Sequence, residues 1–311
     1  MSDAKKSLEP GDAQRYVLVV VHVGREEALS SANSVVEKLL EAGISPVLPP
    51  EEFRTFADDQ PKVLMLGRDI QLEELELCIV LGGDGTILRA AELAHEARIP
   101  ILGVNLGHVG FLAQSERAEQ DATIQHVVDR DYLVEERVVI EVRVLLEGKE
   151  IFRSWALNEA AIEKANRERM LELALEVDGH PVSSYGADGV LLSTPTGSTA
   201  YAFSSGGPIM WPDLDALLIV PLNAHALFSR PLILSPKSSI AVELLERNQG
   251  TGVLWLDGRR SVALEPGSRI EAKRSETPVL LARLSPENFA ERLVKKFNLP
   301  VTGWRGPREA G

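Results

Sequence analysis

Cysteine is almost absent from the 311-residue chain, since Cys78 is its one thiol. A single cysteine excludes an intrachain disulfide and a zinc site built from several thiolates. No apolar run reaches the roughly 20 residues that a transmembrane helix needs, because the strongest run covers only residues 16–23. The polar first residues also lack the apolar core of a signal peptide, so we expect a cytoplasmic protein.

Positive charge is in deficit as well. The 33 Lys and Arg residues stand against 46 Asp and Glu residues, which gives a formal net charge of −13. An acidic balance disfavours nucleic acid and anionic membranes as partners, because both are bound through basic surfaces. The 44% hydrophobic and 25% charged shares are those of an ordinary globular protein, and the length corresponds to about two domains.

The first half of the chain alternates apolar runs with amphipathic segments. After a polar, flexible arm over residues 1–15, the pattern predicts strands at 16–23, 77–81 and 99–104, with helices at 26–41 and 86–96. Gly43 stands where a helix C-cap is expected. Strand–helix–strand order predicts a parallel sheet, so we assign residues 16–130 to an α/β domain.

Later segments alternate apolar and polar residues with period two. Residues 131–284 therefore read as a β-rich, antiparallel domain, with a hairpin at Asp178 and Gly179 and a last strand at 279–284. Residues 285–311 form a C-terminal helix and a tail, and we expect the helix to pack back on the N-terminal domain.

A glycine turn at residues 82–85, Gly-Gly-Asp-Gly, joins the strand at 77–81 to the next helix. Glycines let a backbone approach a ligand or adopt positive φ, and the free N–H groups of a helix start favour phosphate. The simpler interpretation is a tight turn around Asp84. A carboxylate beside a phosphate site would instead serve as a general base or a metal ligand. The turn is neither a P-loop nor a GxGxxG fingerprint.

Two further clusters lie in the second half. Residues 193–201, Ser-Thr-Pro-Thr-Gly-Ser-Thr-Ala-Tyr, concentrate hydroxyls that can bind sugar and phosphate oxygens, and Tyr201 can stack on a base. Asn158 and Glu159 offer hydrogen bonds to a purine or a ribose. Taken alone, the first cluster is also typical of an ordinary Ser/Thr-rich loop, and the dipeptide is common.

In this order, the three clusters together with Asp188 and Gly189 resemble the NAD kinase family, and its bacterial, actinobacterial members in particular. Residues 223–230 and 299–306 also resemble those members, so the similarity spans residues 16–306. The glycine turn is shared with other kinases, whereas the STPTGSTAY stretch is specific to this family.

The resemblance implies an α/β domain with a parallel sheet, an antiparallel β-sandwich-like domain, and an active site between them. It implies transfer of a phosphoryl group from ATP or polyphosphate to the 2′-hydroxyl of the adenosine ribose of NAD, with Asp84 as general base. It also implies a homodimer or homotetramer. The residues implied to contact NAD are Asp84, Gly85, Arg89, Asn158, Glu159, Arg169, Asp188, Thr199, Ala200, Tyr201, Ala202, Phe203 and Ser204.

We expect Mg²⁺ to be held mainly by the donor phosphates and water, without a dedicated metal cluster in the protein. Two other functions remain open from the sequence. One is a lipid or sphingoid kinase, which shares the glycine turn but which the acidic balance disfavours. The other is a non-catalytic dinucleotide sensor, which would gain little from a carboxylate beside phosphate.

Overall fold

The computed structural model describes residues 14–22, 24, 26–56, 62–106, 110–113, 115–116, 119–166, 169–227, 229–285 and 288–301. Most of the expected arm over residues 1–15, and the tail from residue 302 onward, lie outside these ranges. The chain divides into two compact units. The first comprises Met1–Val134 and Leu281–Gly311, and the second comprises Glu135–Leu280.

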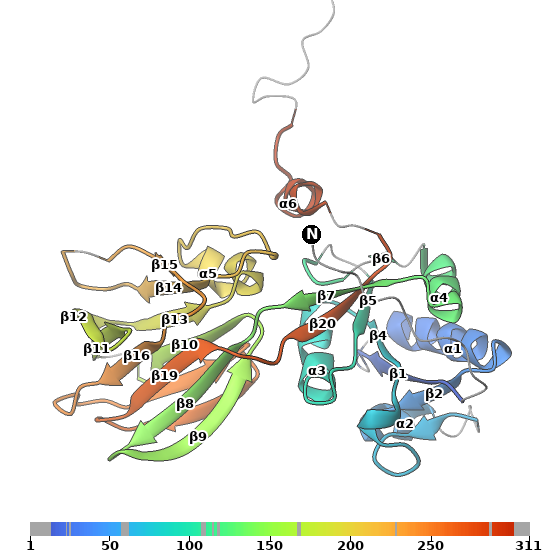
Figure 1. The fold of residues 1–311 in the computed structure, drawn as a ribbon, viewed down its shortest axis with the longest axis horizontal. Coiled ribbons are helices and arrows are strands. Elements are labelled where there is room, and N and C mark those ends of the chain that lie inside the picture. Colours follow the sequence, from blue (N-terminus) through green and yellow to red (C-terminus); the bar gives the residue numbers. More distant parts are fainter. Residues whose placement is uncertain are drawn as a thin grey trace, which may run out of the picture. The chain divides into compact units, whose positions relative to one another are not determined.

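In its described part, the first unit is built on an eight-stranded sheet (Figure 1). The strand order is β3-β2-β1-β4-β5-β20-β7, and β6 also pairs with β5. The strands are β1 (Tyr16–Val21), β2 (Ser45–Leu48), β3 (Leu64–Met65), β4 (Leu77–Leu81), β5 (Ile101–Asn105), β6 (Ser115–Glu116), β7 (Leu133–Arg137) and β20 (Val279–Arg283). The helices are α1 (Glu26–Glu41), α2 (Pro50–Phe56), α3 (Asp84–Ala94), α4 (Gln120–Asp129) and α6 (Phe289–Phe297), with a 3₁₀ turn η1 (Leu72–Glu74).

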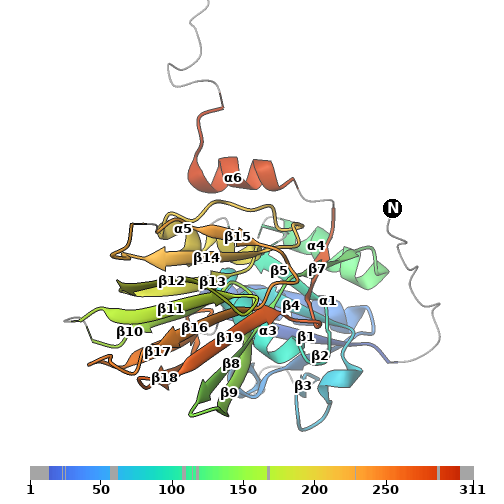
Figure 2. The same cartoon turned by 60° about the vertical axis from the view of Figure 1, so that its left-hand side comes forward.

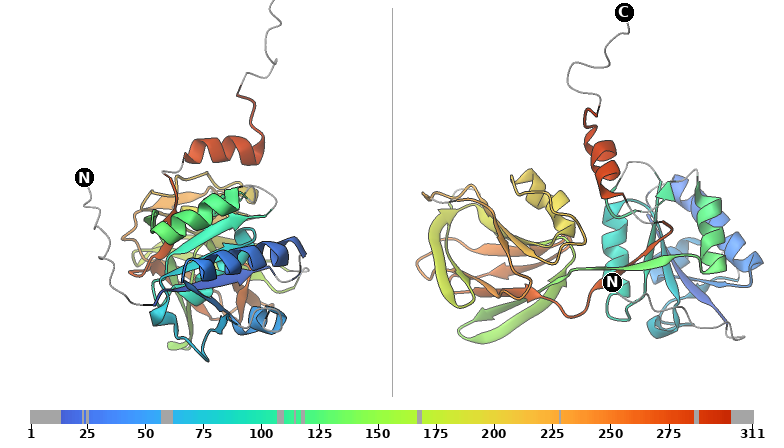
Figure 3. Two further views of the ribbon diagram at one scale, coloured as in Figure 1. Left: turned by 90° about the vertical axis from the view of Figure 1, so that its right-hand side faces the viewer. Right: turned by 45° about the horizontal axis from the view of Figure 1, so that its top comes forward.

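Strands β1, β4 and β5 run parallel in the middle of this sheet, as predicted. Every residue of β4 and β5 is buried, because helices on both faces exclude water from central parallel strands. Helix α1 buries a stripe at three- and four-residue spacing that includes Ala32, Val36 and Leu39. Gly43 follows this helix with φ +74°, the left-handed conformation of a C-cap glycine. Helices α1 and α4 lie side by side on one face (Figure 3).

The strand pairing corrects one prediction. The run at 279–284 was assigned to the β-rich domain, but β20 pairs in parallel with β5 of the first unit. An alternating pattern shows that a segment is a strand, whereas the choice of sheet depends on partners far away in the sequence.

The second unit contains two six-stranded antiparallel sheets (Figures 2 and 3). One has the order β15-β14-β13-β10-β17-β18, and the other has the order β12-β11-β16-β19-β8-β9. The strands are β8 (Ile140–Leu146), β9 (Lys149–Ala156), β10 (Glu159–Lys164), β11 (Leu171–Val177), β12 (His180–Ala187), β13 (Gly189–Ser193), β14 (Leu217–Leu222), β15 (Leu232–Leu234), β16 (Ile240–Leu244), β17 (Gly252–Leu256), β18 (Arg260–Leu264) and β19 (Arg269–Arg274).

The two sheets share one hydrophobic core, to which both contribute alternate residues. Asp178 and Gly179 make the predicted hairpin between β11 and β12, and both have positive φ. A second, smaller core lies against the other side of β10, β13 and β14. It includes Ala202 and Met210, so the segment between β13 and β14 packs on the first of the two sheets with its 3₁₀ turn η3 (Thr196–Thr199) and short helix α5 (Tyr201–Ser204).

Candidate active site

The glycine turn lies where the sheet of the first unit changes the direction of its connections. From β1 the chain crosses through α1 to β2 on one side, and from β4 it crosses through α3 to β5 on the other. In open α/β sheets, ligands bind at the carboxyl ends of two strands that diverge in this way. Residues 82–85 directly follow β4, which places Asp84 at this point of the sheet.

The carboxylate of Asp84 is held by two backbone donors. The N–H of Phe111 donates to Oδ2 at 3.0 Å, and the N–H of Leu112 donates to Oδ1 at 3.1 Å. Gly110 makes this approach feasible, because a Cβ on it would lie 2.3 Å from Oδ1 of Asp84. Asp84 is the first residue of α3, so its side chain has a defined direction rather than the freedom of a loop residue.

The glycines of the turn allow close approach rather than an unusual backbone conformation. Gly82, Gly83 and Gly85 do not have positive φ. A Cβ on Gly82 would lie 2.5 Å from Oγ1 of Thr86, so this glycine permits close internal packing. Cβ positions on Gly83 and Gly85 would meet no described atom within 4 Å. Those two glycines leave open space beside Asp84, as a phosphate-binding turn requires.

Arg89 does not lie free beside the turn. Its Nη2 donates to the carboxylate of Glu52 at 2.5 Å and to the carbonyl of Val21 at 2.7 Å. The Glu52 side chain is fully buried, and no motif in the sequence points to it. Arg89 therefore joins α2, α3 and the end of β1 through its Nη2.

In the second unit, Asn158 and Glu159 lie at the turn between β9 and β10. The buried carboxylate of Asp257 accepts hydrogen bonds from the N–H groups of Leu157, Asn158 and Glu159, at 3.0, 2.7 and 3.3 Å. Arg260 donates to the same carboxylate at 3.1 Å. Burial raises the pKa of Asp257, while these N–H groups and Arg260 oppose the rise. Asp257 thus fixes the backbone that presents Asn158 and Glu159.

The hydroxyl-rich stretch packs on this same turn. The side chains of Ser193 and Thr194 donate to the carbonyls of Asn158 and Leu157, at 3.1 and 2.5 Å. A Cβ on Gly197 would lie 2.0 Å from the carbonyl oxygen of Asn158, so only glycine allows the contact. The sequence clusters at 158–159 and 193–199 are therefore neighbours in the fold.

Most of these hydroxyls also donate hydrogen bonds within the chain, so they fix the loop that carries them. Besides Ser193 and Thr194, the buried Ser198 bonds to the backbone of Pro195 and Met210. Thr199 donates to the carbonyl of Thr196 at 3.3 Å. Residue composition could not separate ligand-binding hydroxyls from loop-fixing ones, because both use the same chemical group.

Glu159, the first residue of β10, is a buried acid that faces the first residue of α5. Its carboxylate accepts a hydrogen bond from the N–H of Tyr201, and its Oε2 has no hydrogen-bond partner. Burial, together with the charges of Asp257 and Glu163, raises the pKa of Glu159 to about 8, although the Tyr201 N–H opposes the rise. An ordinary glutamate is ionised at neutral pH, whereas the surroundings of Glu159 favour its neutral form.

Asp188, Tyr201 and Ser204 line one hollow of about 550 Å³. Asp188 pairs with Lys164 at 2.5 Å and accepts from Asn223 at 2.9 Å, and both bonds lower its pKa. Tyr201 donates to Glu163 at 2.7 Å. The hollow therefore combines an aromatic ring with paired charges and a hydroxyl.

The remaining predicted residues of this group differ in exposure. The Phe203 side chain is exposed, and Thr199 and Ala200 are half-buried. The Ala202 side chain is buried in the small core, so Ala202 can offer a ligand only its backbone. Arg169 lines a different hollow with Lys164 and Met170.

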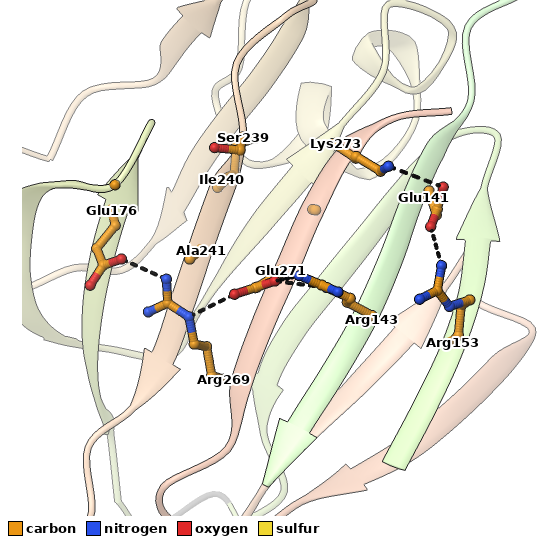
Figure 4. Close-up of a pocket in the computed structure, with 12 residues that line it drawn as sticks. Glu141, Arg143, Arg153, Glu176, Ser239, Ile240, Ala241, Arg269, Glu271 and Lys273 are labelled. Carbon is orange, nitrogen blue, oxygen red and sulfur yellow. Dashed lines mark hydrogen bonds and ion pairs between the residues drawn. The ribbon is translucent and has the colours of Figure 1, made fainter. Parts of the chain in front are cut away.

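A further hollow of about 350 Å³ lies over the sheet that contains β8 and β19 (Figure 4). Its charged side chains pair with one another. Arg269 bonds to Glu176 at 2.7 Å, and Arg143 pairs with Glu271 at 2.5 Å. This ladder ties neighbouring strands together and contains none of the predicted site residues.

Two family models match the chain. The ATP-NAD kinase N-terminal domain matches residues 17–132, and the ATP-NAD kinase C-terminal domain matches residues 157–284. An "NAD kinase" of Leifsonia xyli is 57% identical over 298 residues, with 95% of this chain and 98% of the relative covered. "NAD kinase 2" of Streptomyces coelicolor is 52% identical, with 94% of this chain and 97% of the relative covered.

Solved structures give the same picture of the fold. A yeast NADH kinase complexed with NADH superposes with a TM-score of 0.84 at 22% identity, covering 96% of this chain and 91% of the other. An NAD kinase from Archaeoglobus fulgidus in complex with ATP has a TM-score of 0.68 at 25% identity, covering 92% of this chain and 100% of the other.

Proposed function

The chain belongs to the NAD kinase family, and on that premise we propose that it transfers a phosphoryl group from ATP to the 2′-hydroxyl of the adenosine ribose of NAD, giving NADP. The relatives that match nearly its full length carry the name NAD kinase, and the lipid kinase and sensor alternatives gain no support from them. The observation that carries the proposal is the Asp84 carboxylate, oriented by two N–H groups beside the open positions at Gly83 and Gly85.

Asp84 acts as the general base in this proposal. A ribose hydroxyl is a weak nucleophile at neutral pH, and a positioned carboxylate accepts its proton as the new P–O bond forms. The transition state of phosphoryl transfer is loose, so catalysis depends chiefly on position and charge. The bonds from Phe111 and Leu112 support such a role because they fix the direction of the carboxylate without neutralising it.

NAD is bound in this proposal by Asn158, Glu159, Arg169, Asp188 and residues 199–204 of the second unit, and by Gly85 and Arg89 of the first. The hollow lined by Asp188 and Tyr201 and the unpartnered Oε2 of Glu159 support this assignment. A protonated Glu159 would donate a hydrogen bond to a ligand oxygen, where the sequence suggested only an acceptor.

Magnesium is proposed to arrive with the donor phosphates, and polyphosphate is the alternative donor to test. Among the described residues, no group of three or more His, Cys, Asp or Glu side chains is arranged to hold a metal ion. The Asp84 carboxylate is an oxygen ligand of the kind that Mg²⁺ prefers, so the site fits an ion held jointly with phosphates. Magnesium would supply charge neutralisation on the transferred group.

No helix in the described ranges is long and apolar enough to cross a membrane. We propose that the protein acts in the cytoplasm, which its single, buried cysteine supports. A homodimer or homotetramer is also proposed, and the exposed apolar side chains of Trp211, Leu227 and Ile233 support association through the second unit.

The experiment is an endpoint assay with NAD, MgCl₂ and either ATP or polyphosphate, in which an NADP-specific dehydrogenase detects the product. We expect NADP from the wild type with ATP, and a loss of about 10²–10⁴-fold in kcat for Asp84→Asn. Asp213→Asn, which removes an exposed carboxylate of the second unit, serves as the control and keeps wild-type turnover.

No NADP with either donor would refute the kinase assignment. Wild-type turnover by Asp84→Asn, with NAD binding intact in a thermal-shift assay, would refute the role of Asp84 alone.

A further inference from the structure

Residues 110–113 form a short segment that faces Asp84 through its backbone. The N–H groups of Phe111 and Leu112 hold the two carboxylate oxygens, and Gly110 makes room for them. Asp84 can keep its direction only as long as this segment stays in place.

Two arginines from the C-terminal end of the chain hold the carbonyls of the same segment. Arg292 of α6 donates through Nη1 to the carbonyl of Phe111 at 3.2 Å and also to the carbonyl of Ala113. Arg283 at the end of β20 donates to the carbonyl of Leu112 at 3.1 Å. Three consecutive carbonyls, those of residues 111–113, are thus bonded by guanidinium groups, while the N–H groups of the first two of these residues bond to Asp84.

Aromatic packing fixes α6 to this segment. The ring of Phe111 lies 6.0 Å from the ring of Phe289 and 5.8 Å from that of Phe297, measured between centroids. Phe289, Leu293 and Phe297 are spaced four residues apart and so form one face of the helix. Asn288 caps the helix by accepting a hydrogen bond from the N–H of Glu291.

We propose that α6 is a positioning element for catalysis, in which Arg292 holds residues 111–113 so that their N–H groups aim the Asp84 carboxylate at the acceptor hydroxyl. The proposal rests on the proposed role of Asp84. Arg292 itself is not a catalytic residue, because its bonds go to backbone carbonyls of the segment. Its removal therefore affects the reaction step rather than the binding of either substrate.

The test compares Arg292→Met, which keeps most of the apolar stem and removes the donors, with Arg292→Lys, which keeps one cationic donor. A displacement of about 1 Å in a catalytic group can cost about 10²-fold, so we expect kcat to fall 10- to 100-fold in R292M. The KM values for NAD and ATP should stay within about threefold of the wild type, and R292K should lie between R292M and the wild type in kcat. Lys296→Met, which removes another cation from α6, is the matched control and keeps wild-type kcat.

Hydrogen exchange gives a second readout that does not depend on activity. The amides of Phe111 and Leu112 should exchange faster in R292M than in the wild type, because the segment opens locally once its carbonyl bonds are lost. Wild-type kcat in R292M, or a loss that appears only in KM, overturns the proposal, as does unchanged exchange at these two amides. If the wild type makes no NADP, the kinase assignment fails instead. The exchange experiment still tests whether Arg292 holds residues 111–113 in place.

Discussion

At the scale of single residues, the two acids of the candidate site have opposite environments. Asp84 accepts hydrogen bonds from two backbone N–H groups, which fix the direction of its carboxylate. Glu159 is buried with one oxygen unpartnered and lies near the charges of Asp257 and Glu163, which favour a neutral carboxyl. Two acids in different environments can perform different tasks in one reaction.

Glu159→Gln tests the environment of Glu159 through the pH dependence of stability. The folded-state pKa of about 8 is above the ordinary value of 4.5, so the wild type loses stability as pH rises through that interval. Gln cannot ionise, and the stability of the variant relative to the wild type should therefore rise with pH. The slope should reach at most about 1.4 kcal/mol per pH unit. It should vanish above about pH 8–9.

Urea unfolding of both proteins from pH 5 to pH 9 measures this difference. The part of this difference that is the same at every pH reflects the shape and hydrogen bonding of the amide, and only its change with pH reports the ionisation of Glu159. A difference that does not change over the range would show that Glu159 ionises normally in the folded protein.

At the scale of elements, the turn between β9 and β10 depends on a residue about 100 positions away. Asp257 accepts from three successive N–H groups of this turn. In Asp257→Asn, the side-chain NH₂ would face one of those donors, and a buried N–H would lose its acceptor. We expect a loss of about 1–3 kcal/mol in the free energy of unfolding. We also expect an increase of tenfold or more in the KM for NAD, with the KM for ATP nearly unchanged.

Asp178→Asn is the matched control for this substitution. Asp178 also precedes a glycine, also has positive φ, and accepts from the N–H of Ser239 at 2.8 Å, but it lies in the hairpin of the other sheet. Both variants should lose stability, and only Asp257→Asn should lose affinity for NAD. An equal effect of both on the KM for NAD would mean that Asp257 acts through general stability alone.

Local patterns predicted many elements because their causes are local. The helix expected at 26–41 is α1 with the same bounds, since its apolar stripe and its glycine cap lie within 18 residues. The hairpin at Asp178 and Gly179 is confirmed for the same reason. The placement of β20 was wrong because pairing with β5 is a long-range event.

The site was predictable only in its chemical groups. The motifs located Asp84, the 158–159 turn and the 193–201 stretch, but not the residues that hold them. No local sequence pattern shows that Gly110, Asp257 and Arg292 hold the site. Arg292, for example, bonds to Phe111, which lies 181 positions before it in the sequence. The family resemblance implied that Arg89 contacts NAD, and nothing local in the sequence reveals its bond to the buried Glu52.

At the scale of the whole molecule, the two units have separate hydrophobic cores. Cys78 lies fully buried in the central strand β4 of the first unit, where burial raises the pKa of its thiol, so thiol reagents should reach it only when that unit opens. Trp155, Trp211 and Trp255 belong to the second unit. A Trp304→Phe variant removes the one tryptophan outside it, so that fluorescence reports the second unit alone.

In this variant we expect the two units to unfold in urea with different midpoints. The reactivity of Cys78 follows the first unit, and tryptophan fluorescence follows the second. Cooperativity within one core does not require cooperativity between two.

Because most proposed NAD contacts belong to the second unit, NAD at about 100 times its Kd should stabilise the fluorescence transition by about 2.7 kcal/mol. NMN, which lacks the adenosine half, is the control ligand. Coincident transitions without ligand would show that the units unfold as one, and a fluorescence midpoint insensitive to NAD would remove the second unit from the proposed binding site.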